Sequence, residues 1–209
     1  MNLSYTRWLI DYCLREGFIS AYYEPLFKTK IYYLTYKGKE MICDQAMVEH
    51  YHFEKSHAGL NTFIHHNNMI EAFIILKSHL NIKEWVCEWD LRKGKRAGEK
   101  IPDGLIIFTD GMKVALEVET RYKKLGILRN FIKRYRYDIE KIARYDAVLI
   151  VAFSRPQYEG LKLRLFNLSP EFFNRRFMVT DIGMLEHGMC FYEGELRHLE
   201  DAFALLKKG

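Results

Sequence analysis

The sequence predicts an α/β fold, a mixed sheet flanked by helices, and three stretches of the chain carry that prediction. The apolar runs Leu105–Phe108 and Val114–Val118 are separated by an Asp-Gly dipeptide at 110–111, the pattern of two strands joined by a tight turn. Over Tyr122–Arg144 the apolar residues recur every three or four positions, as in an amphipathic helix. Asp146–Phe153 contains a continuous apolar run, typical of a strand that is buried on both faces.

Length and composition suit one main domain with a small additional module. The chain has 209 residues, and its 49% hydrophobic content supports a sizeable core. No apolar run is long enough to span a membrane, and polar residues interrupt the N-terminal stretch where a signal peptide would need an apolar segment. The cysteines are scattered without a Cys-x-x-Cys pair, which indicates reduced thiols in a cytoplasmic protein. A net charge of +5 mildly favours a polyanionic partner.

The chain begins with a predicted amphipathic helix, Tyr5–Arg15, which we expect to end at Gly17. A hairpin of two strands is expected over Ile19–Leu34. This order is similar to the back half of a winged helix-turn-helix, in which the helix reads DNA and basic residues contact phosphates. Those basic residues would be Arg7, Lys28 and Lys30.

We therefore predict a partial winged-helix module over residues 1–45, a linker over 46–60 and a larger domain over 61–209. The module is partial because the chain begins almost on its recognition helix. A scaffold hairpin that does not contact DNA is the alternative. The linker contains a His-Tyr-His run at 50–52, the shape with which many rolling-circle nucleases hold a metal. No strand pattern surrounds it, so we interpret it as part of the linker.

A long helix, Asn61–Leu80, is expected to open the larger domain. Its apolar stripe would consist of Met69, Phe73, Ile74, Leu76 and Leu80. His65 lies near the start of this helix and Glu71 follows, and a capping cluster with a solvated Glu71 is as plausible as a functional pair. Beyond the helix, Glu84–Asp90 alternates apolar and polar residues, as a strand beside the hairpin would.

A predicted basic loop, Leu91–Lys100, would join that strand to the hairpin. Its cations are Arg92, Lys93, Lys95, Arg96 and Lys100. A basic loop beside a cluster of carboxylates suits contact with a DNA backbone, and a solvated hairpin tip is the alternative.

The hairpin carries three carboxylates that we expect to meet at one end of the sheet. Asp103 stands at the head of the first strand, while Glu117 and Glu119 end the second. Residues two apart in a strand project from the same face, so the two glutamates share a side and the hairpin folds Asp103 toward them. Convergent carboxylates repel one another unless they hold a hard divalent cation, so the pattern predicts a site for Mg²⁺ or Mn²⁺.

The amphipathic helix Tyr122–Arg144 is basic on the faces that its apolar stripe leaves exposed. The stripe would consist of Leu125, Leu128, Ile132, Tyr135, Ile139 and Ile142. Lys123 lies at its start, close to Glu119, and Lys124 is a neighbouring candidate for contact with DNA. Tyr135 falls on the buried side, so we interpret it as structural.

The last part of the chain is predicted to be peripheral. We expect a helix over Tyr158–Leu168, a strand over Phe177–Thr180 and a final helix over Leu196–Leu206. Nucleotide-binding and acyl-transfer motifs are absent from the sequence, including Gly-x-Gly-x-x-Gly, the P-loop and Gly-x-Ser-x-Gly.

Two overlapping resemblances start from the acidic hairpin. Pro102-Asp103 followed by Glu117-Val118-Glu119 resembles the PD-(D/E)xK motif of restriction-endonuclease-like nucleases, except that Glu119 stands where the motif has Lys. The segment from Glu117, with Lys123 and Tyr135, resembles the replication-relaxation and MobC-type plasmid mobilisation proteins. In that family a winged helix precedes a PD-(D/E)xK-like domain.

The resemblance implies a restriction-endonuclease-like domain over 61–209 and a metal-dependent DNA endonuclease of the nickase or relaxase kind. Its implied role is nicking DNA in conjugative plasmid mobilisation or replication. The implied partners are origin DNA and accessory proteins of a relaxosome. His65 and Glu71 match, by position, a histidine and an acid that the family places on its first helix.

The same resemblance assigns roles to the acidic hairpin. Asp103 and Glu117 would bind Mg²⁺ or Mn²⁺, the Val118 carbonyl is a candidate third ligand, and Glu119 would be a further ligand or a base. Lys123 would replace the missing motif Lys and stabilise charge on the phosphate. Glu71 would assist as a ligand or base.

Two other classes of function remain open at this point. A catalytically inactive DNA-binding accessory or regulatory protein of a mobile element is favoured by the missing motif Lys and the short winged helix. A purely structural partner in a relaxosome is the third class.

Overall fold

The computed structural model describes residues 3–24, 29–35, 37–38, 60–93 and 101–207. These residues belong to two compact units, Met1–Ala58 and Gly59–Gly209. No helix among the described residues is both long and apolar enough to cross a membrane. Several predictions fall outside the described residues: the His-Tyr-His run at 50–52, Lys28, and the loop cations Lys95, Arg96 and Lys100.

The first unit consists of a helix and a two-stranded hairpin. Helix α1 (Leu3–Arg15) stops before Gly17, and the strands β1 (Ile19–Glu24) and β2 (Thr29–Leu34) pair antiparallel, with Ile19 opposite Leu34. The Thr35 hydroxyl donates to the Gly17 carbonyl at 2.5 Å and so ties the end of the hairpin to the end of the helix. The predicted helix and hairpin are therefore both present.

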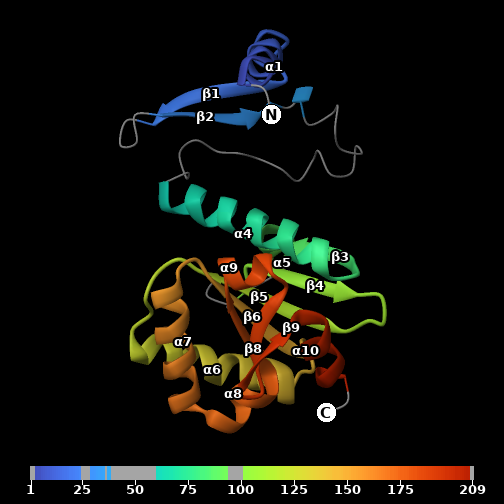
Figure 1. Cartoon of the computed structure of the whole chain (residues 1–209), viewed down its shortest axis with the longest axis vertical. Helices are drawn as coiled ribbons and strands as arrows, with labels where there is room; N and C mark the ends of the chain where they lie inside the picture. The colour runs from blue at the N-terminus through green and yellow to red at the C-terminus, as the bar shows by residue number, and fades with distance from the viewer. Residues whose placement is uncertain (1–2, 25–28, 36, 39–59, 94–100, 208–209) are drawn as a thin grey trace. The chain divides into compact units, whose positions relative to one another are not determined.

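The second unit is built on a seven-stranded mixed sheet in the order β3-β4-β5-β6-β7-β8-β9 (Figure 1). Its strands are β3 (Ile82–Cys87), β4 (Gly104–Phe108), β5 (Lys113–Glu119), β6 (Ala147–Ala152), β7 (Phe177–Asp181), β8 (Met189–Tyr192) and β9 (Glu195–His198). The central strands β5, β6 and β7 are parallel, and the strands on both sides of them pair antiparallel. The prediction of a mixed α/β sheet is confirmed.

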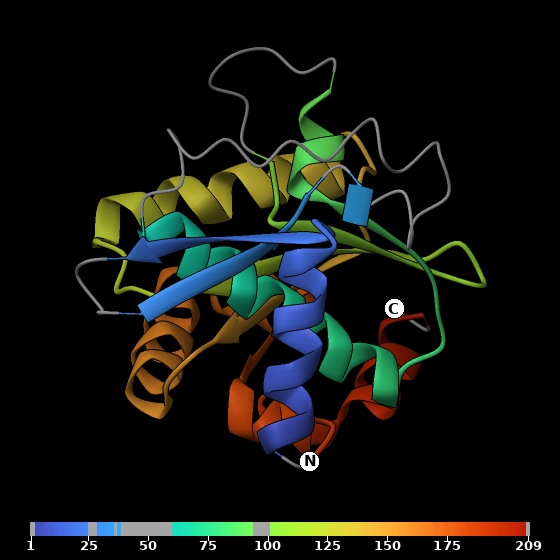
Figure 2. The same ribbon diagram turned by 90° about the horizontal axis from the view of Figure 1, so that it is seen from above.

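Helices cover both faces of this sheet. On one face lie α4 (Leu60–His79), α9 (Ile182–Glu186) and α10 (Leu199–Leu206). The other face packs against α6 (Leu125–Glu140), α7 (Arg155–Leu168) and α8 (Pro170–Arg176). Figure 1 shows α4 and α6 on opposite sides, and Figure 2 shows α4 from above, in teal, lying across the strands. Strand β6 is buried along its whole length, as predicted.

The predicted hairpin of β4 and β5 positions the acids. Gly111 adopts a φ of +89°, a conformation that glycine takes readily, and its N–H donates to the Phe108 carbonyl at 3.0 Å. Asp110 accepts from the Met112 N–H at 3.1 Å, which closes the turn. Gly104 lies opposite Leu116, and this register carries the preceding Asp103 to the level of Glu117.

The long helix of the larger domain is present, but its apolar stripe differs from the predicted one. Ile74 is exposed, whereas Ala72 is buried beside Met69 and Leu76. The spacing of the buried residues follows the helical repeat, and Ile74 falls off that face. The prediction for Ile74 was wrong.

The strand predicted over Glu84–Asp90 is shorter, because β3 ends at Cys87 and a short helix, α5 (Glu88–Arg92), follows it. Glu88 and Asp90 lie in the first turn of α5 and Arg92 in its last, an arrangement that complements the helix dipole. The alternation of Trp85, Cys87 and Trp89 suggested a longer strand, but Trp89 is exposed. Arg92, predicted to lie in a loop, is therefore helical.

The helix predicted over Tyr122–Arg144 is also shorter, since α6 covers only Leu125–Glu140. Leu125 and Ile142 are exposed, so the outer ends of the predicted stripe were wrong. The helix closes where Ala143 adopts a left-handed φ of 53° and the Arg144 N–H donates to the Asp138 carbonyl at 2.9 Å.

The last part of the chain is not peripheral. Strand β7 is fully buried, and β8 and β9 extend the sheet. The final helix begins at Leu199 and not at Leu196, because Glu195–His198 forms β9. A two-residue turn joins β8 to β9, with Glu193 at a φ of 52° and Gly194 at 83°, the sign of both angles that a tight hairpin turn requires.

Candidate functional site

Two carboxylates are buried at the end of the central strand β5. Glu117 and Glu119 share the face of β5 that packs against α6 and α7, together with Ala115. Glu117 is 1% exposed and Glu119 is 7% exposed. Burying a carboxylate is unfavourable unless it gains hydrogen bonds or an opposite charge, so the partners of each acid decide what the site is.

Glu117 accepts a hydrogen bond from the hydroxyl of Tyr135 on α6. The pKa of Tyr135 is raised well above its ordinary value, first because burial disfavours the phenolate and then because the Glu117 charge opposes it. The phenol therefore stays protonated and serves as a donor. The prediction that Tyr135 is buried is confirmed.

Glu119 forms an ion pair with Lys123, which lies in the segment between β5 and α6. The Lys123 ammonium also lies 4.9 Å from the centre of the Phe131 ring, within the range of a cation–π contact. The ring and the carboxylate together hold the lysine beside the end of β5. Lys124 occupies the N-cap position of α6 and is exposed.

Asp103 lies just before β4 and uses both carboxylate oxygens. Oδ2 accepts from the Val118 N–H at 2.7 Å, and Oδ1 lies 3.2 Å from Nε2 of His65 on α4. The hydrogen bond to Asp103 raises the pKa of His65, and burial of the ring partly opposes that rise. The neighbouring His66 has a lowered pKa because its ring is partly desolvated and because His65 repels a second positive charge.

Glu88 completes this side of the site, although sequence reasoning did not single it out. Its N–H donates to the Asp103 carbonyl at 3.1 Å, so the backbone fixes the two residues relative to each other. Its side chain pairs with Arg92 one turn later in α5. One ligand atom from each of His65, Glu88 and Asp103 lies within 4.8 Å of the other two.

The three acids of the hairpin are not gathered into one such group. Among the described residues, only His65, Glu88 and Asp103 meet the spacing of a shared ion. Each of these acids has a protein partner, so repulsion among them does not by itself require a cation. Asp103 belongs both to the three acids of the hairpin and to the group with His65 and Glu88.

The other predicted site residues lie away from this cluster or are engaged elsewhere. Glu71 is exposed on α4, and six positions from His65 correspond to about 240° around a helix axis. Arg92 pairs with Glu88, and Lys93 pairs with Asp90 at 2.8 Å. In the first unit, Arg7 is exposed on α1.

A small hollow lies next to Glu119. Its volume is about 10 Å³, room for a single water, and the lining includes Arg121, Lys123, Gln157 and Arg164. The Gln157 amide donates to the Thr120 carbonyl at 2.7 Å, while its buried oxygen has no hydrogen-bond partner in the protein.

A larger open groove of about 510 Å³ runs along the outer side of α6. It is lined by Asn130, Lys133, Arg134, Tyr137, Asp138, Ile142 and Arg144. Asp138 is buried and lies 3.3 Å from Arg134 and 3.7 Å from Arg144, so it orients both guanidinium groups. The exposed Lys133 and Tyr137, beside the partly buried Arg134 and Arg144, are suited to the phosphates and bases of a nucleic-acid strand.

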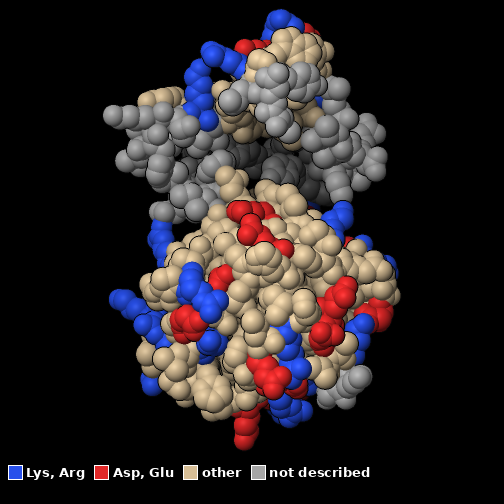
Figure 3. All heavy atoms as spheres, viewed as in Figure 1, with Lys and Arg blue, Asp and Glu red and all other residues tan. Residues whose placement is uncertain are grey.

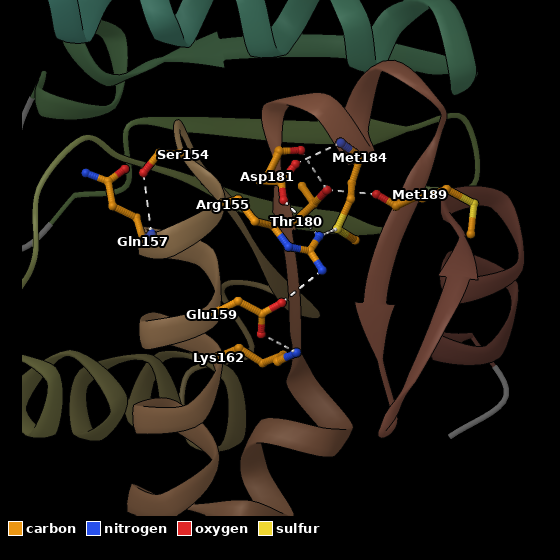
Figure 4. Close-up of polar contacts among 9 residues, drawn as sticks. All are labelled: Ser154, Arg155, Gln157, Glu159, Lys162, Thr180, Asp181, Met184 and Met189. Carbon is orange, nitrogen blue, oxygen red and sulfur yellow. Dashed lines mark hydrogen bonds and ion pairs between the residues drawn. The ribbon is translucent and has the colours of Figure 1, made fainter.

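A second polar cluster, at the start of α7, is structural (Figure 4). Asp181 caps α9 by accepting from the Met184 N–H at 2.9 Å and also pairs with Arg155 at 3.1 Å. Arg155 contacts Glu159 at 2.9 Å, and Glu159 contacts Lys162 at 2.8 Å. Because every charge in this chain of contacts is matched, the cluster ties α7 to the end of β7 and does not offer a ligand site.

The face of the second unit drawn in Figure 3 carries charges of both signs. Acidic and basic side chains are interspersed over the described part of the second unit on the face drawn there. A nucleic-acid surface is expected to gather one sign of charge. The outer side of α6, with its exposed cations Arg129, Lys133 and Arg136, meets that expectation better.

Comparison with known proteins gives no relative for this chain. No protein-family model, no curated protein and no solved structure matches it. The function is therefore argued from the residues and their geometry.

Proposed function

We propose that the second unit is a metal-dependent DNA phosphodiesterase centred on Asp103, Glu117, Glu119 and Lys123. The observation that carries the proposal is the pair of nearly buried glutamates at the end of a central strand, with a lysine on one of them and Asp103 alongside. Burying charged carboxylates in the core of a sheet costs free energy, and a sheet with only a structural role would have apolar residues at these positions.

Carboxylate oxygens are the ligands that Mg²⁺ and Mn²⁺ prefer. The side chains of Asp103, Glu117 and Glu119 would have to turn from their present partners to share one ion. A cation bound there would polarise a phosphate oxygen and lower the pKa of a bound water. Lys123 would then stabilise the negative charge that develops on the phosphate. Tyr135 keeps Glu117 in place by its hydrogen bond, so we assign it a positioning role.

DNA is the proposed substrate for two reasons. The groove along α6 presents Lys133 and Tyr137 with two oriented arginines, which suits a polyanionic strand. The resemblance of the acidic hairpin to plasmid mobilisation proteins narrows the reaction to nicking at an origin. That narrowing rests on the resemblance alone.

The alternative is a DNA-binding accessory protein without catalysis. It is favoured by the protein partners of the three acids, since Tyr135, Lys123 and the Val118 N–H account for the cluster without an ion. In that case the basic groove of α6 would carry the function.

Nicking of supercoiled plasmid in Mg²⁺ or Mn²⁺, with and without a candidate origin, separates the two. We expect cation-dependent nicked circles from the parent chain and a loss of at least about 100-fold in rate for Glu117→Gln, the scale of losing one group of an electrostatic site. The matched control Glu71→Gln changes an exposed glutamate and should nick like the parent. Salt-sensitive DNA binding without nicking by the parent would reject the nuclease and favour the accessory protein.

A further inference from the structure

We propose that His65, Glu88 and Asp103 form a binding site for one divalent transition-metal ion, for which Mn²⁺ is the test ion. The site differs from the predicted set of Asp103, Glu117 and Glu119, because only Asp103 belongs to both. It stands on its own three side chains and does not depend on the proposed nuclease activity.

The spacing of the donor atoms fits a metal ion. Two ligands that each lie about 2.0–2.1 Å from a metal, at tetrahedral or octahedral angles, are separated by about 2.9–3.4 Å. Nε2 of His65 and Oδ1 of Asp103 lie 3.2 Å apart, and one ligand atom from each of His65, Glu88 and Asp103 lies within 4.8 Å of the other two.

Groups outside the trio hold the ligands in position. The Val118 N–H fixes the second oxygen of Asp103 at 2.7 Å, and the Glu88 N–H fixes the Asp103 backbone at 3.1 Å. Arg92 pairs with one oxygen of Glu88, and a carboxylate offers a second oxygen to a metal. Outer contacts of this kind orient ligands and increase metal affinity.

Access to the site is open. The side chains of His65, Glu88 and Asp103 are 25%, 22% and 14% exposed. An ion can therefore enter from solvent, and water can fill the remaining coordination positions. The three residues come from α4, α5 and the start of β4, so binding would tie three elements together.

The ligand types select the class of metal. An imidazole nitrogen suits Zn²⁺ and other transition-metal ions, and the two carboxylates also suit Mn²⁺, whereas Mg²⁺ and Ca²⁺ prefer oxygen ligands throughout. Two carboxylates balance the charge of a divalent cation when His65 is neutral. We therefore expect Mn²⁺ to bind in the presence of excess Mg²⁺.

The test is Mn²⁺ titration of the chelator-treated full chain, followed by the loss of the free-ion EPR signal. We expect one Mn²⁺ per chain, little competition from a tenfold excess of Mg²⁺, and nitrogen modulation from an imidazole in the pulsed EPR spectrum. His65→Ala should abolish the nitrogen modulation, and both His65→Ala and Glu88→Gln should weaken binding at least tenfold. His66→Ala is the matched control and should bind like the parent.

Each outcome of this titration is decisive once circular dichroism shows that the variants are folded. No Mn²⁺ binding by the parent would overturn the site. Loss of binding in Glu117→Gln, with retention in both His65→Ala and Glu88→Gln, would also overturn it and move the ion to the hairpin acids. Binding as expected without plasmid nicking would support the site and reject the proposed nuclease.

Discussion

Among single residues, Tyr135 donates the hydrogen bond that the buried carboxylate of Glu117 accepts. Its hydroxyl donates to Glu117 in the core, where both residues are 1% exposed. A buried carboxylate that loses a donor keeps its desolvation cost, so the hydrogen bond stabilises the fold whether or not a metal binds. Sequence periodicity placed Tyr135 on the buried side but could not show that it contacts a residue on another element.

Replacing that tyrosine gives the first stability prediction. Tyr135→Phe should lower the free energy of unfolding by about 1–3 kcal/mol, the range for leaving a buried acceptor with fewer hydrogen bonds. Tyr137→Phe on the same helix is the control, because Tyr137 is exposed. Urea unfolding measures both variants. Equal stability of Tyr135→Phe and the parent would contradict the role of the hydroxyl.

The pKa of His65 should lie above the ordinary histidine value of 6.5, and the pKa of the adjacent His66 should lie below it. His65 has a raised pKa because Asp103 accepts its hydrogen bond, and His66 has a lowered pKa because it is partly desolvated. The His65–Asp103 pair thus adds stability that is fully present below pH about 6.5 and is lost as pH rises through the raised pKa. NMR titration of the metal-free protein measures both rings, with Asp103→Asn expected to lower the pKa of His65. Indistinguishable titration of the two rings would reject this assignment.

Among the elements, α5 explains why Glu88 escaped sequence reasoning. The alternation over Glu84–Asp90 reads as a strand of period two, while Glu88 and Arg92 are also spaced for an ion pair on a helix. A short helix cannot be distinguished from the end of a strand by the apolar period alone. Because the strand gives way to a helix at Glu88, the Glu88 N–H bonds to the Asp103 carbonyl. The middle of α6 had no such ambiguity because its apolar repeat covers several helical turns, and β6 had none because it is apolar throughout.

Replacing glycine by alanine should change the stability of the protein in opposite directions at two positions, Gly194 and Gly126. Gly194, in the turn between β8 and β9, has a φ of +83°, so Gly194→Ala should destabilise the protein by about 1 kcal/mol. Gly126 lies in the first turn of α6 with open space around it, so Gly126→Ala should stabilise by up to about 1 kcal/mol. Chemical unfolding compares the two variants with the parent. A stabilising Gly194→Ala would contradict the left-handed turn.

Over the whole molecule, the sequence predicted the layered sheet but not its full width. The central strands were predictable because β6 is apolar throughout and the turn of β4 and β5 has a strong local signature. Strands β8 and β9 are short, and their pairing depends on contacts with β7 that no local pattern reveals. The same limit applies to the candidate site, where Asp103, Glu117 and Glu119 were predicted from spacing. The contacts with His65, Glu88 and Tyr135 required the three-dimensional fold.

The central claim, that this acidic centre cleaves DNA with a bound cation, is tested most directly by the effect of Asp103→Asn on plasmid nicking. Asp103 belongs to both the hairpin acids and the trio with His65, and the asparagine retains its size while removing its charge. With Mn²⁺ present, the parent chain should convert supercoiled plasmid to nicked circles, while the variant and the parent in chelator should not. Nicking by Asp103→Asn at the rate of the parent, or nicking that persists in chelator, would contradict the account.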